Sequence, residues 1–257
     1  MSHRLSVLVG LLVVSLIAWT APRPAAADSA FGDWAAIVVA GDWHAHRGAP
    51  TEVFDNARRD LTRALVARGF EPGHIRTFSV RPERYPKETL LRTGPDAIED
   101  TFNSLARAAP GGCLVYFTSH GSPAGILVNG RVWQPSAMAD LIDGACGTRP
   151  TVVILSACFS GVFIPVLAAA NRMILTAARA DRASFGCGES DRYTFFDTCV
   201  LQKIGHAHDF QALGHQVQVC VAKREHELKA APPSDPQIEI GSAIRPMLPL
   251  YAFAASP

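Results

Sequence analysis

Two short segments of the sequence hold side chains suited to nucleophilic chemistry. Residues 118–122 read TSHGS and contain His120, and residues 156–161 read SACFSG and contain Cys158. Each segment directly follows an apolar run rich in β-branched residues. A cysteine thiolate can attack an electrophilic carbon while a nearby imidazole takes and returns the proton. If the two runs are neighbouring parallel strands, His120 and Cys158 lie at the same edge of the sheet.

Each of the two residues also has a simpler structural explanation. A single cysteine at a strand end is commonly a small buried hydrophobic residue, and a His-Gly pair is typical of a turn. Their occurrence at equivalent ends of two apolar runs, flanked by serine and glycine, favours catalysis. Gly121 and Cys158 are then the expected backbone donors to an oxyanion, because glycine allows the backbone to approach the reacting carbonyl closely.

The elements that must position these residues are visible as apolar runs and helical periodicities. Continuous apolar runs predict strands buried on both faces, at residues 35–40, 75–80, 113–118, 151–155 and 172–176. Helical spacing of apolar residues predicts helices at 52–68, 96–109 and 136–143. The alternation predicts one α/β domain, over about residues 32–228, with a mostly parallel sheet between two layers of helices. Residues 229–257 are rich in Pro, Ala and Ser and are expected to form an irregular tail on the surface.

The order of these motifs resembles that of the legumain-type cysteine peptidases (peptidase C13), which are relatives of the caspases and of the catalytic subunit of the GPI-anchor transamidase. The resemblance extends to residues 34–41, 175–178 (LTAA) and 183–187 (ASFGC) and covers about residues 34–202. The SACxSG and TAARADRxSFGC stretches look most like those of bacterial members. The resemblance implies a caspase-like fold and an endopeptidase that forms a thioester with its substrate.

Carried over residue by residue, the resemblance makes His120 the general base and Cys158 the nucleophile. It places the oxyanion hole at the N–H groups of Gly121 and Cys158. The expected lining of the substrate channel is Ser156, Ala183, Ser184 and Asp197. Legumains have an acid two residues before the nucleophile, where this chain has Ser156, so a strict preference for asparagine is not expected. Arg47 and Asn56 are the candidates for the first-loop Arg and Asn of the family.

The same residues are also compatible with two other functions. The fold could be retained as a catalytically inactive binding module, although His120 and Cys158 are both present. The same thioester could instead be intercepted by an amine, which would make the protein a transpeptidase. Asp197 could simply cap the helix that follows it.

Composition limits the partners of the chain. The 257 residues include 24 basic and 23 acidic side chains and no Lys/Arg-rich run, so nucleic-acid binding has no electrostatic support and a polypeptide substrate is expected. The sequence has no C-x-x-C motif. The pairs His44/His46 and His206/His208 lack a third ligand at a recognisable spacing, so neither a metal nor a cofactor is expected.

The first 27 residues have the pattern of a secretory signal peptide. A basic start at Arg4 precedes an apolar run from Leu5 to Trp19, and residues 25–27 (AAA) form a small-residue cleavage site. The run is shorter than the roughly 20 residues that span a bilayer, although an uncleaved anchor is the alternative. The mature chain would be periplasmic or secreted, with 22 basic and 23 acidic residues and no stable membrane insertion. The sequence does not indicate the oligomeric state.

All six cysteines lie between residues 113 and 220. In an oxidising compartment some of them should pair. We expect at most two disulfides, with Cys158 free as the one reactive thiol. Cys113 is the best second candidate for a free thiol because it begins a buried strand. The remaining four cysteines could then pair: Cys146, Cys187, Cys199 and Cys220.

We predict that residues 1–27 are removed during export. Mass spectrometry of the exported protein should find the mature N-terminus close to Asp28. Recovery of peptides that contain Met1 from the exported protein would contradict the prediction.

Overall fold

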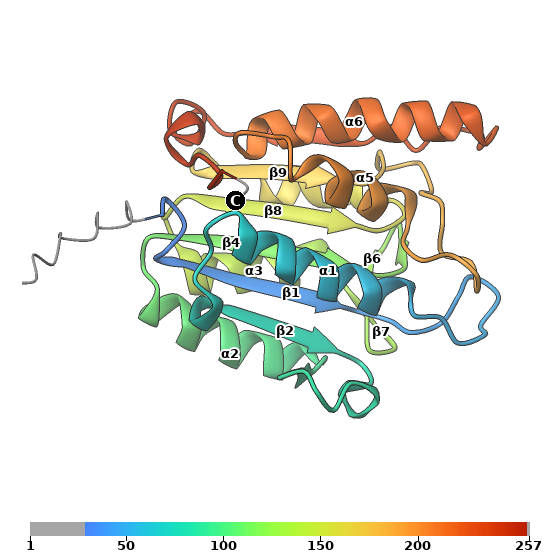
Figure 1. The fold of residues 1–257 in the computed structure, drawn as a ribbon, viewed down its shortest axis with the longest axis horizontal. Coiled ribbons are helices and arrows are strands. Elements are labelled where there is room, and N and C mark those ends of the chain that lie inside the picture. Colours follow the sequence, from blue (N-terminus) through green and yellow to red (C-terminus); the bar gives the residue numbers. More distant parts are fainter. Residues whose placement is uncertain (1–28, 256–257) are drawn as a thin grey trace, which may run out of the picture.

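The main sheet of the computed structural model, which describes residues 29–255, has seven strands in the order β10-β9-β8-β4-β1-β2-β3 (Figure 1). All neighbouring pairs are parallel except β10 with β9. The strands are β1 (Trp34–Ala40), β2 (Ile75–Ser79), β3 (Leu91–Arg92), β4 (Gly112–Thr118), β8 (Thr151–Ser156), β9 (Arg172–Thr176) and β10 (Gln237–Ile240). The five predicted strands are therefore present and parallel to one another.

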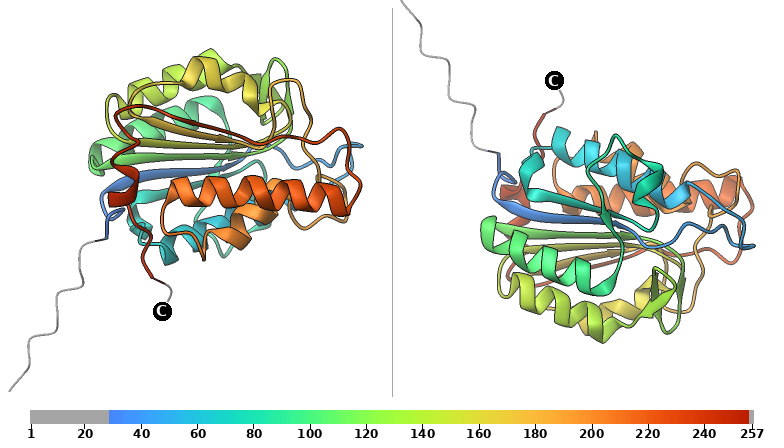
Figure 2. Two further views of the ribbon diagram at one scale, coloured as in Figure 1. Left: turned by 90° about the horizontal axis from the view of Figure 1, so that it is seen from above. Right: turned by 90° about the horizontal axis from the view of Figure 1, so that it is seen from below.

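Helices cover both faces of this sheet (Figure 2). One face packs against α1 (Val53–Ala67), α5 (Phe195–Lys203) and α6 (Phe210–Glu227), and the other against α2 (Pro95–Ala108), α3 (Pro135–Cys146) and α4 (Ile164–Leu167). Short 3₁₀ helices lie at Pro72–His74, Pro82–Arg84, Ser160–Phe163 and Leu248–Leu250. The predicted three-layer α/β architecture is confirmed.

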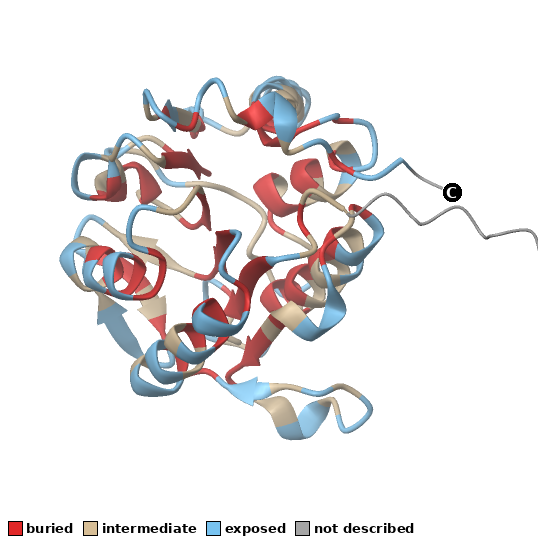
Figure 3. Cartoon of the chain, turned by 90° about the vertical axis from the view of Figure 1, so that its left-hand side faces the viewer, coloured by how far each residue is buried: buried red, intermediate tan, exposed pale blue. Residues whose placement is uncertain are grey.

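Side chains of each central strand alternate between the two layers of helices. In β1, Ala36 and Val38 join the core that contains helix α1, whereas Ile37 and Val39 join the core that contains helix α2. All seven residues of β1 and of β4 are buried. Figure 3 shows the buried segments in red in the interior of the molecule and the exposed segments mainly at its periphery. Burial on both faces explains why these strands read as unbroken apolar runs.

A small antiparallel sheet follows His120 directly. It consists of β5 (Gly121–Ser122), β6 (Gly125–Val128) and β7 (Arg131–Trp133). The turn between β6 and β7 is Asn129-Gly130, and both residues have positive φ, at 49° and 78°. An Asn-Gly pair is the usual two-residue hairpin turn, so this signal could have predicted the hairpin despite its short strands.

The predicted irregular tail is wrong for residues 237–240, and the domain continues beyond residue 228. Strand β10 pairs with β9 at the edge of the sheet, and Ile244 and Leu248 are fully buried in the core. The strand has only four residues and lies within a Pro- and Ser-rich segment, so the composition of the segment did not indicate a strand.

Two disulfides are present, which agrees with the predicted maximum, but one of them involves Cys113. Cys113 of β4 is bonded to Cys146, the last residue of α3, and Cys199 of α5 is bonded to Cys220 of α6. The prediction that Cys113 is unpaired is therefore wrong. Its side chain points to the α3 layer and meets the end of that helix, so burial in the strand does not isolate it. The two free cysteines are Cys158 and Cys187.

We predict that loss of the α5–α6 disulfide lowers the free energy of unfolding. The bridge closes a loop with a sequence separation of 21 residues, for which about 3 kcal/mol is expected. The double variant Cys199→Ala/Cys220→Ala should unfold at a lower denaturant concentration than the wild type. The control is Cys187→Ala, which removes a sulfur atom outside both bridges. Equal midpoints for the double variant and the wild type would contradict the prediction.

Candidate functional site

His120 and Cys158 lie at the same edge of the sheet, where the arrowheads of β1, β2 and β8 point in Figure 1. Strands β4 and β8 are adjacent, and their last residues, Thr118 and Ser156, are partners in the register. His120 and Cys158 each follow such a partner by two residues. The two strands are adjacent and parallel, as the sequence predicts.

The segments that carry the two residues approach each other closely. The N–H of Ser119 donates to the carbonyl of Ser156 (3.0 Å). A Cβ atom on Gly121 would lie 2.1 Å from the carbonyl oxygen of Cys158 and 3.0 Å from the Cβ atom of Ala157. Only glycine fits at position 121 without displacing the backbone around Cys158.

The ring of His120 is held by one hydrogen bond and one aromatic contact. Its Nε2 lies 2.9 Å from the carbonyl oxygen of His44, and its ring makes an edge-to-face contact with Phe54, with the ring centroids 5.1 Å apart. A carbonyl oxygen can only accept, so Nε2 carries the hydrogen. In the neutral ring, Nδ1 is therefore the atom that can accept a proton.

The thiol of Cys158 is half-buried and lies against residues 182–184. The N–H of Ser184 donates to Sγ (3.3 Å), and the carbonyl oxygen and Oγ of Ser184 lie 3.5 and 3.7 Å from the sulfur. Phe159 has a φ of 58°, and its N–H donates to the carbonyl of Arg182 (2.8 Å). Of the two predicted channel residues in this segment, Ser184 contacts the sulfur and is half-buried, and its neighbour Ala183 is exposed.

Asp197 and Ser156, the other predicted channel residues, lie beneath this surface. Asp197 is 0% exposed. Its carboxylate accepts hydrogen bonds from Tyr116 (2.5 Å) and Thr118 (2.7 Å). Burial raises the pKa of Asp197, and these hydrogen bonds partly oppose the rise. Ser156 is also buried, and its Oγ lies 3.2 Å from that of Thr194. Neither side chain lines an open channel, because the first turn of α5 packs under the ends of β4 and β8.

The N-terminus of α5 is capped by a different residue from the one considered in the sequence. The hydroxyl of Thr194 accepts the N–H of Asp197 (2.9 Å), so Thr194 is the N-cap. The carboxylate of Asp197 is instead directed at the hydroxyl groups of β4. Asp197 therefore ties the first turn of α5 to the strand that carries His120.

Sequence reasoning missed the contacts that three residues, Asp42, His44 and Phe54, make around His120. The carbonyl of His44 and the ring of Phe54 contact His120, while Asp42 binds His44 through one carboxylate oxygen. Cys187 packs against Phe54, Val53 and Ala40. Asp42 and His44 follow β1 directly, at the same end of the sheet as the ends of β4 and β8, and this position is the signal that could have identified these two residues.

The other candidates have different surroundings. Arg47 is exposed. The side chain of Asn56 donates to the carbonyl of Arg192 (3.2 Å) and accepts from Arg59 (2.6 Å). Among residues 29–255, no group of three or more His, Cys, Asp or Glu side chains has a geometry that could hold a metal ion.

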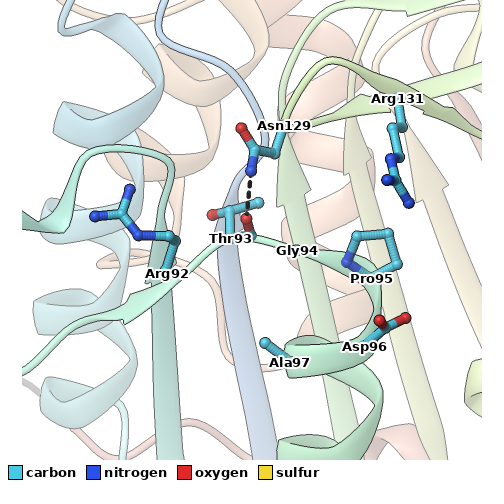
Figure 4. A pocket seen from close by; sticks show the side chains of 8 residues that line it. All are labelled: Arg92, Thr93, Gly94, Pro95, Asp96, Ala97, Asn129 and Arg131. Carbon is cyan, nitrogen blue, oxygen red and sulfur yellow. Dashed lines mark hydrogen bonds between the residues drawn. The ribbon is translucent and has the colours of Figure 1, made fainter.

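A cavity of about 480 Å³ lies beyond β5–β7, next to the loop before α2 (Figure 4). Arg92 and Arg131 lie on two sides of it, and the side chain of Asn129 donates to the carbonyl of Thr93 (3.0 Å). Neither His120 nor Cys158 lines this cavity. The hydrogen bond between Asn129 and Thr93 ties the β6–β7 hairpin to the loop before α2.

Comparison with known proteins identifies the class of the fold and then the family. The structure is similar to the crystal structure of caspase-1 from Spodoptera frugiperda, with a TM-score of 0.59 and 17% sequence identity over 86% of this chain and 92% of that chain. The fold is therefore caspase-like. The model of the Peptidase C13 family matches residues 96–226, and the chain belongs to that family of cysteine peptidases. A comparison with curated proteins finds no match.

We predict that a small alkylating reagent labels Cys158 well before Cys187. Burial, and secondarily the charge of Cys158, raise the pKa of Cys187 to about 11. A raised pKa means that the thiolate forms only as the pH rises, so less than roughly 0.1% of Cys187 is reactive at pH 7.5. Peptide mapping after timed labelling should find Cys158 first, and His120→Ala should slow its labelling.

The control for this experiment is labelling at increasing pH. The rate at Cys187 should rise steeply as the pH approaches 11, while the disulfide-bonded cysteines stay unlabelled. Equal rates for Cys158 and Cys187 at pH 7.5 would contradict the prediction.

Proposed function

We propose that the protein is an exported cysteine endopeptidase that cleaves peptide bonds with Cys158 as the nucleophile and His120 as the general base. The observation that carries the proposal is the pairing of Thr118 with Ser156 at the ends of adjacent parallel strands. Because of this pairing, a histidine and a free cysteine each follow two residues after the carboxyl end of their strand, at the same end of the sheet. Membership of the Peptidase C13 family supports a polypeptide substrate.

The reaction follows from the chemistry of these groups. His120 Nδ1 takes the proton of Cys158, and the thiolate attacks the carbonyl carbon of the scissile peptide bond. A C–S bond forms, and the N–H groups of Gly121 and Cys158 donate to the resulting oxyanion. The C–N bond then breaks as the imidazolium gives its proton to the leaving amine. A water molecule, deprotonated by His120, attacks the thioester and releases the thiol and the new carboxyl terminus.

The contacts of each group support these roles. The carbonyl of His44 accepts from Nε2 of His120, which leaves Nδ1 to exchange the proton. The thiol of Cys158 donates to the carbonyl of Ser184 (3.5 Å), and the N–H of Ser184 donates to the sulfur (3.3 Å), a bond that also stabilises the thiolate once the proton has left. Gly121 packs directly against the backbone of Cys158, so the two proposed oxyanion donors belong to segments in contact.

We propose that Ser184 and the neighbouring Ala183 contact the substrate, and that the buried Ser156 and Asp197 act only by supporting the ends of β4 and β8 from below. The hydroxyl of Ser156 stands where legumains have a carboxylate, so one charge-assisted hydrogen bond to an asparagine amide is lost. Such a bond is worth roughly 1.5–3 kcal/mol. Discrimination in favour of asparagine should therefore be about one to two orders of magnitude weaker than in legumains.

Export to the periplasm or the medium is the proposed location. The three-part pattern of residues 1–27 supports it, and so do the two disulfides, because disulfides persist mainly in oxidising compartments. Among residues 29–255, no helix combines the length and apolar character needed to cross a membrane.

The test is cleavage of a quenched-fluorescence peptide library by the mature chain. Cys158→Ala and His120→Ala should each lower kcat/KM by at least about 10³-fold, since the two groups act as one unit. Cys187→Ala, which removes the other free thiol, should stay within about fivefold of the wild type.

The products decide between the remaining functions. Full activity in Cys158→Ala would contradict the proposal. Products joined to an added amine, at the expense of hydrolysis, would identify a transpeptidase. No cleavage of any peptide by the wild type would favour an inactive binding module.

A further inference from the structure

The loop after β1 leaves the sheet from a firmly fixed point. The N–H of Gly41 donates to the carbonyl of Thr118 (2.9 Å), and its own carbonyl accepts from the N–H of Asn129 (2.8 Å). The hydroxyl of Thr93 donates to the carbonyl of Ala40 (2.9 Å). The end of β1 is thus tied to β4, to the hairpin and to the loop before α2. His44, whose carbonyl meets His120, lies three residues further along.

Asp42 follows Gly41 directly and forms hydrogen bonds to His44. It is 5% exposed, and its Oδ1 accepts three hydrogen bonds, from the N–H of Trp43 (2.7 Å), the N–H of His44 (3.3 Å) and Nδ1 of His44 (2.8 Å). One oxygen therefore holds both the backbone and the ring of His44. A short polar side chain that accepts from the N–H two residues ahead is the usual way to fix such a turn.

Asp42 holds the residue whose carbonyl meets His120, and the N–H of the same peptide group, that of Ala45, donates to the carbonyl of Ala49 (2.7 Å). The carbonyl of His44 lies 2.9 Å from Nε2 of His120. The guanidinium of Arg81 lies over the ring of Trp43, a residue of the same turn, 4.3 Å from its centroid. A rotation of the peptide group after His44 would remove the acceptor of Nε2–H, and both tautomers of His120 would then be available.

We propose that Asp42 is a positioning residue for His120. Its Oδ1 holds His44 so that the carbonyl of that residue keeps Nε2 of His120 protonated and leaves Nδ1 for the proton of Cys158. The inference rests on the proposed role of His120 as the general base. Asp42 acts through hydrogen bonds rather than through its charge, because all three contacts use a single oxygen that an asparagine side chain also provides.

The test compares Asp42→Asn with Asp42→Ala in the mature chain. The asparagine variant keeps the accepting oxygen and should have a kcat within about threefold of the wild type. The alanine variant loses all three bonds and should lose about 10–100-fold in kcat, the size of effect expected when a catalytic group is misplaced by about 1 Å. KM should change less than about twofold in both. Asp140→Ala, at an exposed position of α3, is the matched control.

A second readout does not depend on peptide cleavage. In the Cys158→Ala background, ¹⁵N chemical shifts of His120 report which ring nitrogen carries the hydrogen. We expect the Nε2–H tautomer with Asp42 and with Asp42→Asn, and a mixture of tautomers with Asp42→Ala. If the wild type cleaves no peptide, the proposed function fails, and these shifts alone decide the role of Asp42.

Several outcomes would overturn the inference. They are an Asp42→Ala variant with the kcat of the wild type, an Asp42→Asn variant as impaired as Asp42→Ala, or ¹⁵N shifts of His120 that are the same in all variants. If Asp42→Ala does not fold, Asp42→Ser replaces it, because its hydroxyl can still accept a backbone N–H but is too short to hold the His44 ring as well. Equal kcat values for the serine and asparagine variants would then overturn it.

Discussion

The parallel pairing of β4 with β8 is the constraint on which the rest of the site depends. The two strands are central and buried on both faces, and their register brings Thr118 and Ser156 level with each other. A slip of one residue would send each side chain of a strand to the opposite layer of helices, into a core that is packed around different side chains. The hydrophobic core that stabilises the fold therefore also fixes the relative position of His120 and Cys158.

Much of what surrounds these two residues is main chain. His120 contacts the carbonyl of His44, and Cys158 accepts from the N–H of Ser184. Contacts of this kind place no requirement on residue type, except where the side chain would clash, as at Gly121. Other side chains around the site therefore act indirectly, because they fix the backbone groups that contact His120 and Cys158.

This difference explains what the sequence could and could not predict. Apolar runs and helical spacing predicted the five parallel strands, three of the helices and the neighbourhood of His120 and Cys158, because burial restricts residue type. The contact of His44 with His120 is made by a carbonyl and leaves no trace in the sequence. The burial of Asp197 depends on how α5 meets the sheet, and the pairing of Cys113 depends on where α3 ends, so both require the assembled tertiary structure.

Strand β10 has a consequence for the behaviour of the chain outside the site. It pairs with β9 by antiparallel hydrogen bonds, and the segment after it buries Ile244 and Leu248. A chain cut after α6 would retain His120, Cys158 and all four cysteines of the two disulfides, yet it would expose the main-chain donors and acceptors of β9 and uncover part of the core. An open strand edge is a template for pairing with another molecule. In the intact chain the four-residue strand β10 occupies that edge of β9, so we expect a chain cut after α6 to associate through β9 more readily than the intact chain does.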